Sequence, residues 1–203
     1  MRVAIGQFSE LTDERLTFAE QLGVSGVQLN TPAISGERGY WEYSDLKSLK
    51  DKTEDRGLRL EALENVPIHF YDKAMLGLPG CDQQIENYQT TIANMGKAGI
   101  PILGYHWMPN GVWRTPSVSG RGGATVTSFD ADLIDVQPLT AGTRTLDILE
   151  GVTISRSEMW DNYIRFMEAV VPVAEESGVK LALHPDDPPV PMLGGVARLF
   201  YEP

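Results

Sequence analysis

Five short apolar segments alternate along the chain with longer segments whose apolar residues recur at helical spacing. The apolar segments cover residues 3–8, 26–30, 58–64, 101–106 and 179–184. Each is short and mostly apolar, which is typical of parallel strands that are covered on both faces. The pattern therefore predicts five buried strands separated by helices.

Capping residues indicate where these helices begin. Thr12 and Ser44 are each placed to cap a helix that precedes the next strand. A third helix is expected from Gln83 to Lys97, with apolar residues on one face. The clearest signal is Ser155-Arg156-Ser157-Glu158, which matches the capping-box pattern and precedes a fourth apolar stripe.

Four helix-like segments end on a glycine that is followed directly by an apolar segment. These glycines are Gly23, Gly57, Gly99 and Gly178, and glycine adopts the left-handed conformation after a helix at little cost. The regular alternation predicts an α/β fold with a parallel sheet and right-handed crossovers. We expect a (β/α)8 TIM barrel that is incomplete in this chain, with about five βα units. An open doubly wound sheet is the alternative, although no Gly-x-Gly-x-x-Gly motif follows the first strand.

A segment from about residue 107 to residue 155 separates the last two predicted strands. It is rich in glycine, proline, serine and threonine, and it is too long for an ordinary connection in a compact domain. We expect residues 1–203 to form a single truncated barrel domain in which this segment is an inserted, lid-like loop. An unstructured excursion is the alternative.

Composition and charge limit the kinds of molecule that the protein is expected to bind. The chain has 203 residues, 42% of them hydrophobic, and a formal net charge of −11. Nucleic acids and anionic membranes require clustered cationic residues, so neither is expected as a partner. The sequence has no apolar run long enough for a membrane span and no signal-peptide pattern, which predicts a cytoplasmic protein. Cys81 is the single cysteine and is interpreted as incidental.

Polar residues follow the predicted strands at the end where the active sites of parallel barrels lie. His184 ends the fifth strand in Leu183-His184-Pro185-Asp186-Asp187-Pro188-Pro189, and we interpret it as a metal ligand. The two aspartates either orient it or form a solvated turn. Glu64 and His106 end earlier strands. Arg114 either pairs with the carboxylate of a substrate or is a surface arginine.

Four motifs in the chain resemble those of D-mannonate dehydratases, a family of xylose-isomerase-like TIM barrels. They are Glu64-Asn65-Val66-Pro67-Ile68-His69, residues 85–89 with 94–100, Gly104-Tyr105-His106-Trp107-Met108-Pro109 with Trp113-Arg114-Thr115, and residues 183–189. The resemblance covers about residues 58–203 and is weaker before that. It implies a lyase of glucuronate catabolism that dehydrates D-mannonate to 2-keto-3-deoxy-D-gluconate.

The resemblance also implies a divalent metal cofactor, with Mn²⁺ first and Mg²⁺ or Fe²⁺ as alternatives. It makes His184 one metal ligand. It assigns contacts with a small sugar acid to Glu64, His106, Trp107, Arg114 and Asp186. The remaining ligands of the family come from later strands, so the catalytic proton-transfer residues stay unknown and are expected beyond residue 203.

The chain is accordingly expected to be a fragment with little activity of its own, and the full-length protein is expected to be a homo-oligomer. Two alternatives stay open. One is a sugar isomerase or epimerase on the same barrel, in which Glu64 would be a metal ligand. The other is a half-barrel without catalytic activity, whose exposed sheet edges would favour self-association.

Overall fold

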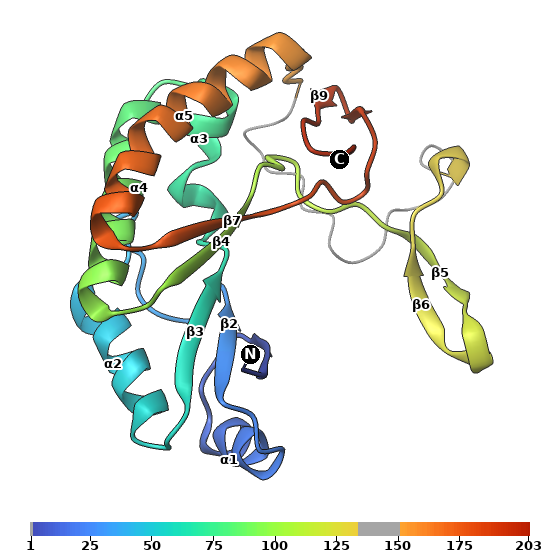
Figure 1. Ribbon diagram of the computed structural model, residues 1–203. Helices are drawn as coiled ribbons and strands as arrows, with labels where there is room; N and C mark the ends of the chain where they lie inside the picture. The colour runs from blue at the N-terminus through green and yellow to red at the C-terminus, as the bar shows by residue number, and fades with distance from the viewer. Residues whose placement is uncertain (1, 134–150) are drawn as a thin grey trace. The chain divides into compact units, whose positions relative to one another are not determined.

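The computed structural model describes residues 2–133 and 151–203, which divide into two compact units. The first unit contains residues 1–106 and 162–184, and the second contains residues 107–161 and 185–203. Figure 1 shows the ribbon of both units.

The secondary structure alternates strands and helices through the first unit. The strands of both units are β1 Ala4–Phe8, β2 Gly26–Asn30, β3 Arg59–Glu64, β4 Ile102–His106, β5 Thr115–Ser119, β6 Thr125–Ser128, β7 Lys180–His184, β8 Met192–Leu193 and β9 Val196–Ala197. The α-helices are α1 Asp13–Gln21, α2 Tyr43–Glu54, α3 Asp72–Leu76, α4 Cys81–Ala98 and α5 Arg156–Ser177. Short 3-10 turns are η1 Ile68–Phe70, η2 Arg121–Gly123 and η3 Ala131–Leu133.

The first unit is built on a parallel sheet of five strands in the order β1-β2-β3-β4-β7. All five predicted strands are present, each within one residue of its expected start and ending where expected. Neighbouring strands are aligned so that Asn30 pairs with Glu64, Glu64 with Gly104, and His106 with His184. The carboxyl ends of β2, β3, β4 and β7 therefore lie along one edge of the sheet.

The four glycines expected after the helices adopt the predicted conformation. Gly23, Gly57, Gly99 and Gly178 have φ values of 67°, 71°, 76° and 67°. Each reverses the chain from the end of a helix into the next strand. This local chemistry is why the alternation of helix and strand was visible in the sequence.

Helices α2, α4 and α5 cover one face of the sheet (Figure 1). Leu63 of β3 and Leu103 of β4 are fully buried, as are Tyr88 and Ile92 of α4 and Val170 of α5. Consecutive strand residues point to opposite faces, and the other face carries both polar and small or apolar residues, among them Gln28, Ala62, Glu64, Gly104 and His184. That difference between the faces places the core on the helical side of the sheet.

The predicted helix starts are confirmed at two of three capping residues. The side chain of Thr12 accepts a hydrogen bond from the backbone N–H of Arg15. The backbone N–H of Ser155 donates to the Glu158 carboxylate at 2.9 Å, and the N–H of Glu158 donates to Ser155 Oγ at 3.3 Å. The prediction for Ser44 was wrong, because α2 begins at Tyr43 and Ser44 lies inside its first turn.

The second unit combines two small antiparallel hairpins with the start of α5. Strands β5 and β6 form one hairpin, and β8 and β9 form the other. Ile154 makes a β-bridge with Val196. Part of the expected lid-like insertion, residues 134–150, lies outside the described residues. The expectation of a single domain with a lid at about 107–155 stays a prediction.

No helix in the two described stretches of the chain is both long and apolar enough to cross a membrane.

Candidate functional site

Two of the predicted site residues, Glu64 and His184, line the same cavity of the first unit. The cavity measures about 330 Å³ and is lined by residues of β2, β3, β4 and β7. Gly104 lies on the strand between them, and a Cβ atom there would be 3.3 Å from Glu64 Cα. The glycine therefore leaves room beside Glu64 that another residue would fill.

The Glu64 carboxylate is held by two glutamine side chains. Gln7 Nε2 donates to both carboxylate oxygens, at 3.0 and 2.9 Å, and Gln28 Nε2 donates to Oε2 at 2.6 Å. Hydrogen bonds to an ionised acceptor are stronger than those between neutral groups. The glutamines thus fix the orientation of the carboxylate at the end of β3.

His106 and His184 are direct neighbours in the pairing of β4 with β7. The hydroxyl of Tyr71 donates to the carbonyl oxygen of His106 at 3.0 Å, and the two rings lie 5.9 Å apart. Burial of Tyr71 raises the pKa of its hydroxyl well above the ordinary value, so this donor keeps its proton. The structure therefore brings both strand-end histidines together, as the sequence suggested.

The donor set at these strand ends does not by itself fit a metal centre. In the part of the chain that the structure describes, no group of three His, Cys, Asp or Glu side chains could hold an ion. His184 offers one imidazole, and both oxygens of Glu64 already accept hydrogen bonds from glutamines. Transition-metal sites in proteins are usually held by three or four protein ligands.

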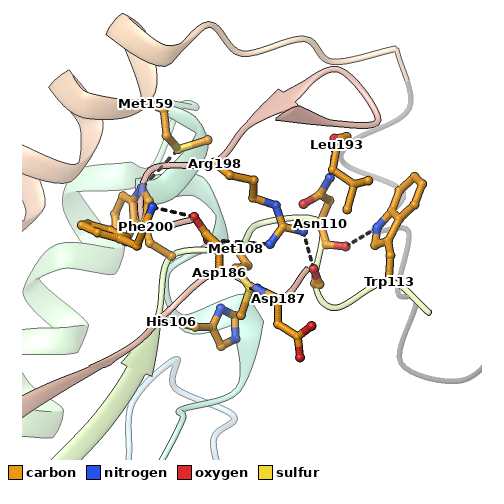
Figure 2. A network of polar contacts seen from close by, with 12 residues as sticks. His106, Met108, Asn110, Trp113, Met159, Asp186, Asp187, Leu193, Arg198 and Phe200 are labelled. Carbon is orange, nitrogen blue, oxygen red and sulfur yellow. Dashed lines mark hydrogen bonds and ion pairs between the residues drawn. The ribbon is translucent and has the colours of Figure 1, made fainter. Parts of the chain in front are cut away.

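The second unit contains a buried ion pair between Asp186 and Arg198 (Figure 2). Arg198 Nη1 lies 3.7 Å from Asp186 Oδ1, and both side chains are almost completely buried. Asp186 Oδ2 accepts the backbone N–H of Phe200 at 2.6 Å. Arg198 Nη2 donates to the carbonyl oxygen of Gly111 at 2.6 Å. Asp186 therefore joins the turn after β7 to the segment after β9.

Burial acts against the charged form of both partners in this pair. It raises the pKa of the Asp186 carboxyl, while the N–H of Phe200 and the charge of Arg198 oppose the increase. It lowers the pKa of the Arg198 guanidinium, which Asp186 opposes. The predicted role of Asp186 in substrate binding stays a prediction, but its carboxylate is engaged in this network.

Arg114 pairs with a carboxylate of the protein itself. Its Nη1 donates to Asp187 Oδ1 at 2.6 Å, and its Nη2 donates to Asp187 Oδ2. Nη1 also donates to the carbonyl oxygen of Trp113 at 3.1 Å. The hydrogen bond and the charge of Asp187 raise the pKa of the Arg114 guanidinium. The two-pronged geometry expected for a substrate carboxylate is thus present, with Asp187 as the acceptor.

Trp107 lies in the interior of the second unit. It is completely buried, and its indole N–H donates to Met159 Sδ at 3.1 Å. The structure gives Trp107 a packing role in the interior. Its predicted contact with substrate stays a prediction.

Three residues that matter at these sites were not singled out in the sequence as partners. They are Gln28, Asn110 and Arg198, which contact Glu64, Leu193 and Asp186 respectively. For Gln28 a signal existed, since it is a polar residue two positions before Asn30 and alternate strand residues share a face. Arg198 carried no such signal, because nothing local distinguishes a buried arginine from an exposed one.

Comparisons with known proteins match these features to one family. The family model described as "D-mannonate dehydratase (UxuA)" matches residues 1–202. A mannonate dehydratase from Streptococcus equi subsp. zooepidemicus is 34% identical over 171 residues, which are 76% of this chain and 46% of that protein. Mannonate dehydratase 2 of Halalkalibacterium halodurans is 30% identical and covers 96% of this chain and 60% of its own length. The chain thus spans about half the length of these curated relatives.

Solved structures agree on the fold. The crystal structure of mannonate dehydratase from Streptococcus suis serotype 2 superposes with a TM-score of 0.80 at 29% identity, covering 99% of this chain and 58% of that one. A D-psicose 3-epimerase, at 10% identity and a TM-score of 0.51, supports the fold alone. The prediction of an incomplete TIM barrel is therefore confirmed, and the chain belongs to the D-mannonate dehydratase family.

Proposed function

We propose that this chain is part of an enzyme that dehydrates D-mannonate to 2-keto-3-deoxy-D-gluconate in glucuronate catabolism. The observation that carries the proposal is the family match over residues 1–202. The proposal is supported by the cavity that Glu64 and His184 both line.

The reaction removes a proton from C2 and a hydroxyl group from C3 of the sugar acid. The C–H electron pair forms the C2–C3 double bond as the C–O bond breaks and water leaves. The resulting enol then takes a proton at C3 and becomes the ketone. Negative charge develops on the carboxylate side during proton removal, so a cationic group near the carboxylate stabilises the transition state. Departure of the hydroxyl needs a general acid.

Each unit, taken by itself, is assigned a binding role. In the first unit, Glu64 and His106 exchange hydrogen bonds with hydroxyl groups of a sugar acid. In the second unit, Arg114 binds a carboxylate. The glutamine contacts on Glu64 support this role, because they orient its carboxylate at the edge of the cavity. The groups that transfer the two protons are unassigned among the described residues.

The proposal includes a divalent cofactor, with Mn²⁺ first and Mg²⁺ or Fe²⁺ as alternatives. His184 supplies one ligand, and the others are not among the described residues. The full-length protein is proposed to act as a homo-oligomer.

A chimeric enzyme tests the function directly. This chain would replace the matching 58% of the Streptococcus suis mannonate dehydratase, a part of that enzyme that covers 99% of this chain. With Mn²⁺ and D-mannonate, the chimera should form a product lighter by one water. The substitution His184→Ala should reduce turnover by at least about a hundredfold, as loss of a metal ligand typically does. Removal of metal with a chelator should give the same loss.

The matched control is His69→Ala. His69 lies in η1, and the hydrogen bond from Gln84 Nε2 is accepted by its backbone oxygen, which the substitution keeps. This variant should keep most of the turnover. A product of unchanged mass would indicate the isomerase or epimerase alternative instead. Full activity of the His184→Ala chimera would rule out the assigned ligand.

A further inference from the structure

A cavity of about 430 Å³ lies in the second unit beside the pair formed by Arg114 and Asp187. Its other walls include Thr127, Ser128 and the two prolines that follow Asp187. The volume lies within the range of small-molecule sites. A cation and two hydroxyl-bearing residues therefore border a space large enough for a sugar acid.

The Arg114 guanidinium in this cavity is already aligned for a planar carboxylate. Both of its terminal nitrogens donate to the two oxygens of Asp187, which is the paired geometry by which arginine recognises carboxylates. The side chains of the pair are 20% and 33% exposed. A dissolved carboxylate can therefore approach the same nitrogens.

The backbone of Asp187 is fixed independently of its ion pair with Arg114. The N–H of Asp187 donates to Met108 Sδ at 3.2 Å, and its neighbour Asp186 is bonded to Phe200 at both backbone and side chain. Arg114 also holds the carbonyl oxygen of Trp113. Release of the Asp187 side chain consequently needs a side-chain rotation and no rearrangement of the turn.

We propose that the Asp187 carboxylate occupies the position on Arg114 that a ligand carboxylate would take. The carboxylate of a sugar acid displaces Asp187 from Arg114 when the sugar acid enters this cavity. This inference rests on the proposed sugar-acid substrate, and it adds a reason why the site would be specific for acids. Partly exposed ion pairs contribute little net stability, so exchange of one carboxylate for another is cheap. A neutral polyol has no group that competes with Asp187, and this displacement therefore selects acids over their reduced analogues.

Equilibrium binding of D-gluconate to the 203-residue chain tests this inference without turnover or metal. Isothermal titration calorimetry would compare the chain with Asp187→Asn, a substitution that keeps the side-chain shape and removes the competing charge. The variant should bind D-gluconate about tenfold more tightly, because Arg114 then lacks an internal anion. Arg114→Gln should abolish binding in both backgrounds.

The controls separate competition at Arg114 from general charge effects and from misfolding. Asp132→Asn changes net charge equally on the exposed turn η3 and should leave the affinity unchanged. D-glucitol should gain nothing from Asp187→Asn. Thermal unfolding of each variant verifies the fold, and Arg114→Lys, which keeps the charge without the paired geometry, should weaken binding without unfolding.

Equal affinity of Asp187→Asn and the unaltered chain for D-gluconate would overturn the proposal, as would an equal gain in Asp132→Asn. An equal gain for inorganic phosphate would overturn the assignment to carboxylates. These results are independent of the chimera: a chimera that fails to dehydrate D-mannonate contradicts the proposed reaction, whereas the gluconate titration reports only on Arg114 and Asp187.

Discussion

Individual residues in the second unit combine burial with charge. Arg198 is completely buried, and two of its nitrogens, Nε and Nη1, lack a hydrogen-bond partner among the described residues. Asp186 Oδ1 and Asn110 Oδ1 lack one as well. Charged groups inside a protein depend on each other, because neither is hydrated. Removal of only one partner of the Asp186–Arg198 pair is therefore expected to lower the stability of the fold strongly.

Arg198→Met should lower the free energy of unfolding by about 3–5 kcal/mol, since it leaves the Asp186 charge buried without its partner. Denaturant titration followed by circular dichroism measures the change. The double variant Arg198→Met with Asp186→Asn removes both charges, and the asparagine oxygen still accepts the N–H of Phe200. It should lose clearly less stability than the single variant, and an equal or larger loss would contradict the interpretation of a coupled pair.

At the scale of elements, helix starts depend on a few local hydrogen bonds. Thr12 begins α1 by accepting the N–H of Arg15 at 3.2 Å. Ser44 looks equivalent in sequence, yet it lies exposed inside α2, whose cap position is Glu42. The apolar residues Trp41 and Leu46, on either side of Ser44, are both fully buried.

Thr12→Ala should therefore destabilise the chain by about 1 kcal/mol, the usual effect of losing a capping side chain. Ser44→Ala serves as the matched comparison and should change stability by no more than about 0.5 kcal/mol, since alanine is favourable inside a helix. Thermal and denaturant unfolding of both variants give the measurement. Equal losses at the two positions would show that the cap assignment is incorrect.

At the scale of the whole molecule, the sheet of the first unit ends in two edge strands. Within residues 2–133 and 151–203, β1 pairs only with β2 and β7 only with β4. Their outer edges carry backbone donors and acceptors that can pair with another strand. The face opposite the helices carries the exposed Ala182 beside the cavity of Glu64 and His184.

The isolated chain is expected to self-associate through the β7 edge in a concentration-dependent manner. Light scattering after size-exclusion chromatography should show species larger than the monomer. Ala182→Lys places a charge on that strand and should shift the distribution toward monomer. Gln21→Lys adds the same charge at the end of α1 and should have no effect. A chain that is monomeric at every concentration would count against an exposed edge.

The sequence by itself determined the features that depend on nearby residues. The five strands, the four left-handed glycines and the caps at Thr12 and Ser155 arise from local periodicity, backbone preference and short-range hydrogen bonds. These features also sufficed to predict a parallel α/β sheet, and the resemblance to mannonate dehydratases favoured an incomplete barrel over an open doubly wound sheet. The strand-end positions of Glu64, His106 and His184 followed from the same alternation.

Only the tertiary structure decided which polar side chains meet. Gln7 reaches Glu64 across 57 positions in the sequence, and Arg114 reaches Asp187 across 73. It also placed Trp107 and Arg198 in the interior. Such pairings depend on chain crossovers and on competition among several possible partners, and neither leaves a local pattern in the sequence. For that reason the sequence could suggest that Arg114 pairs with a carboxylate, whereas only the fold shows that the carboxylate paired with Arg114 is that of Asp187.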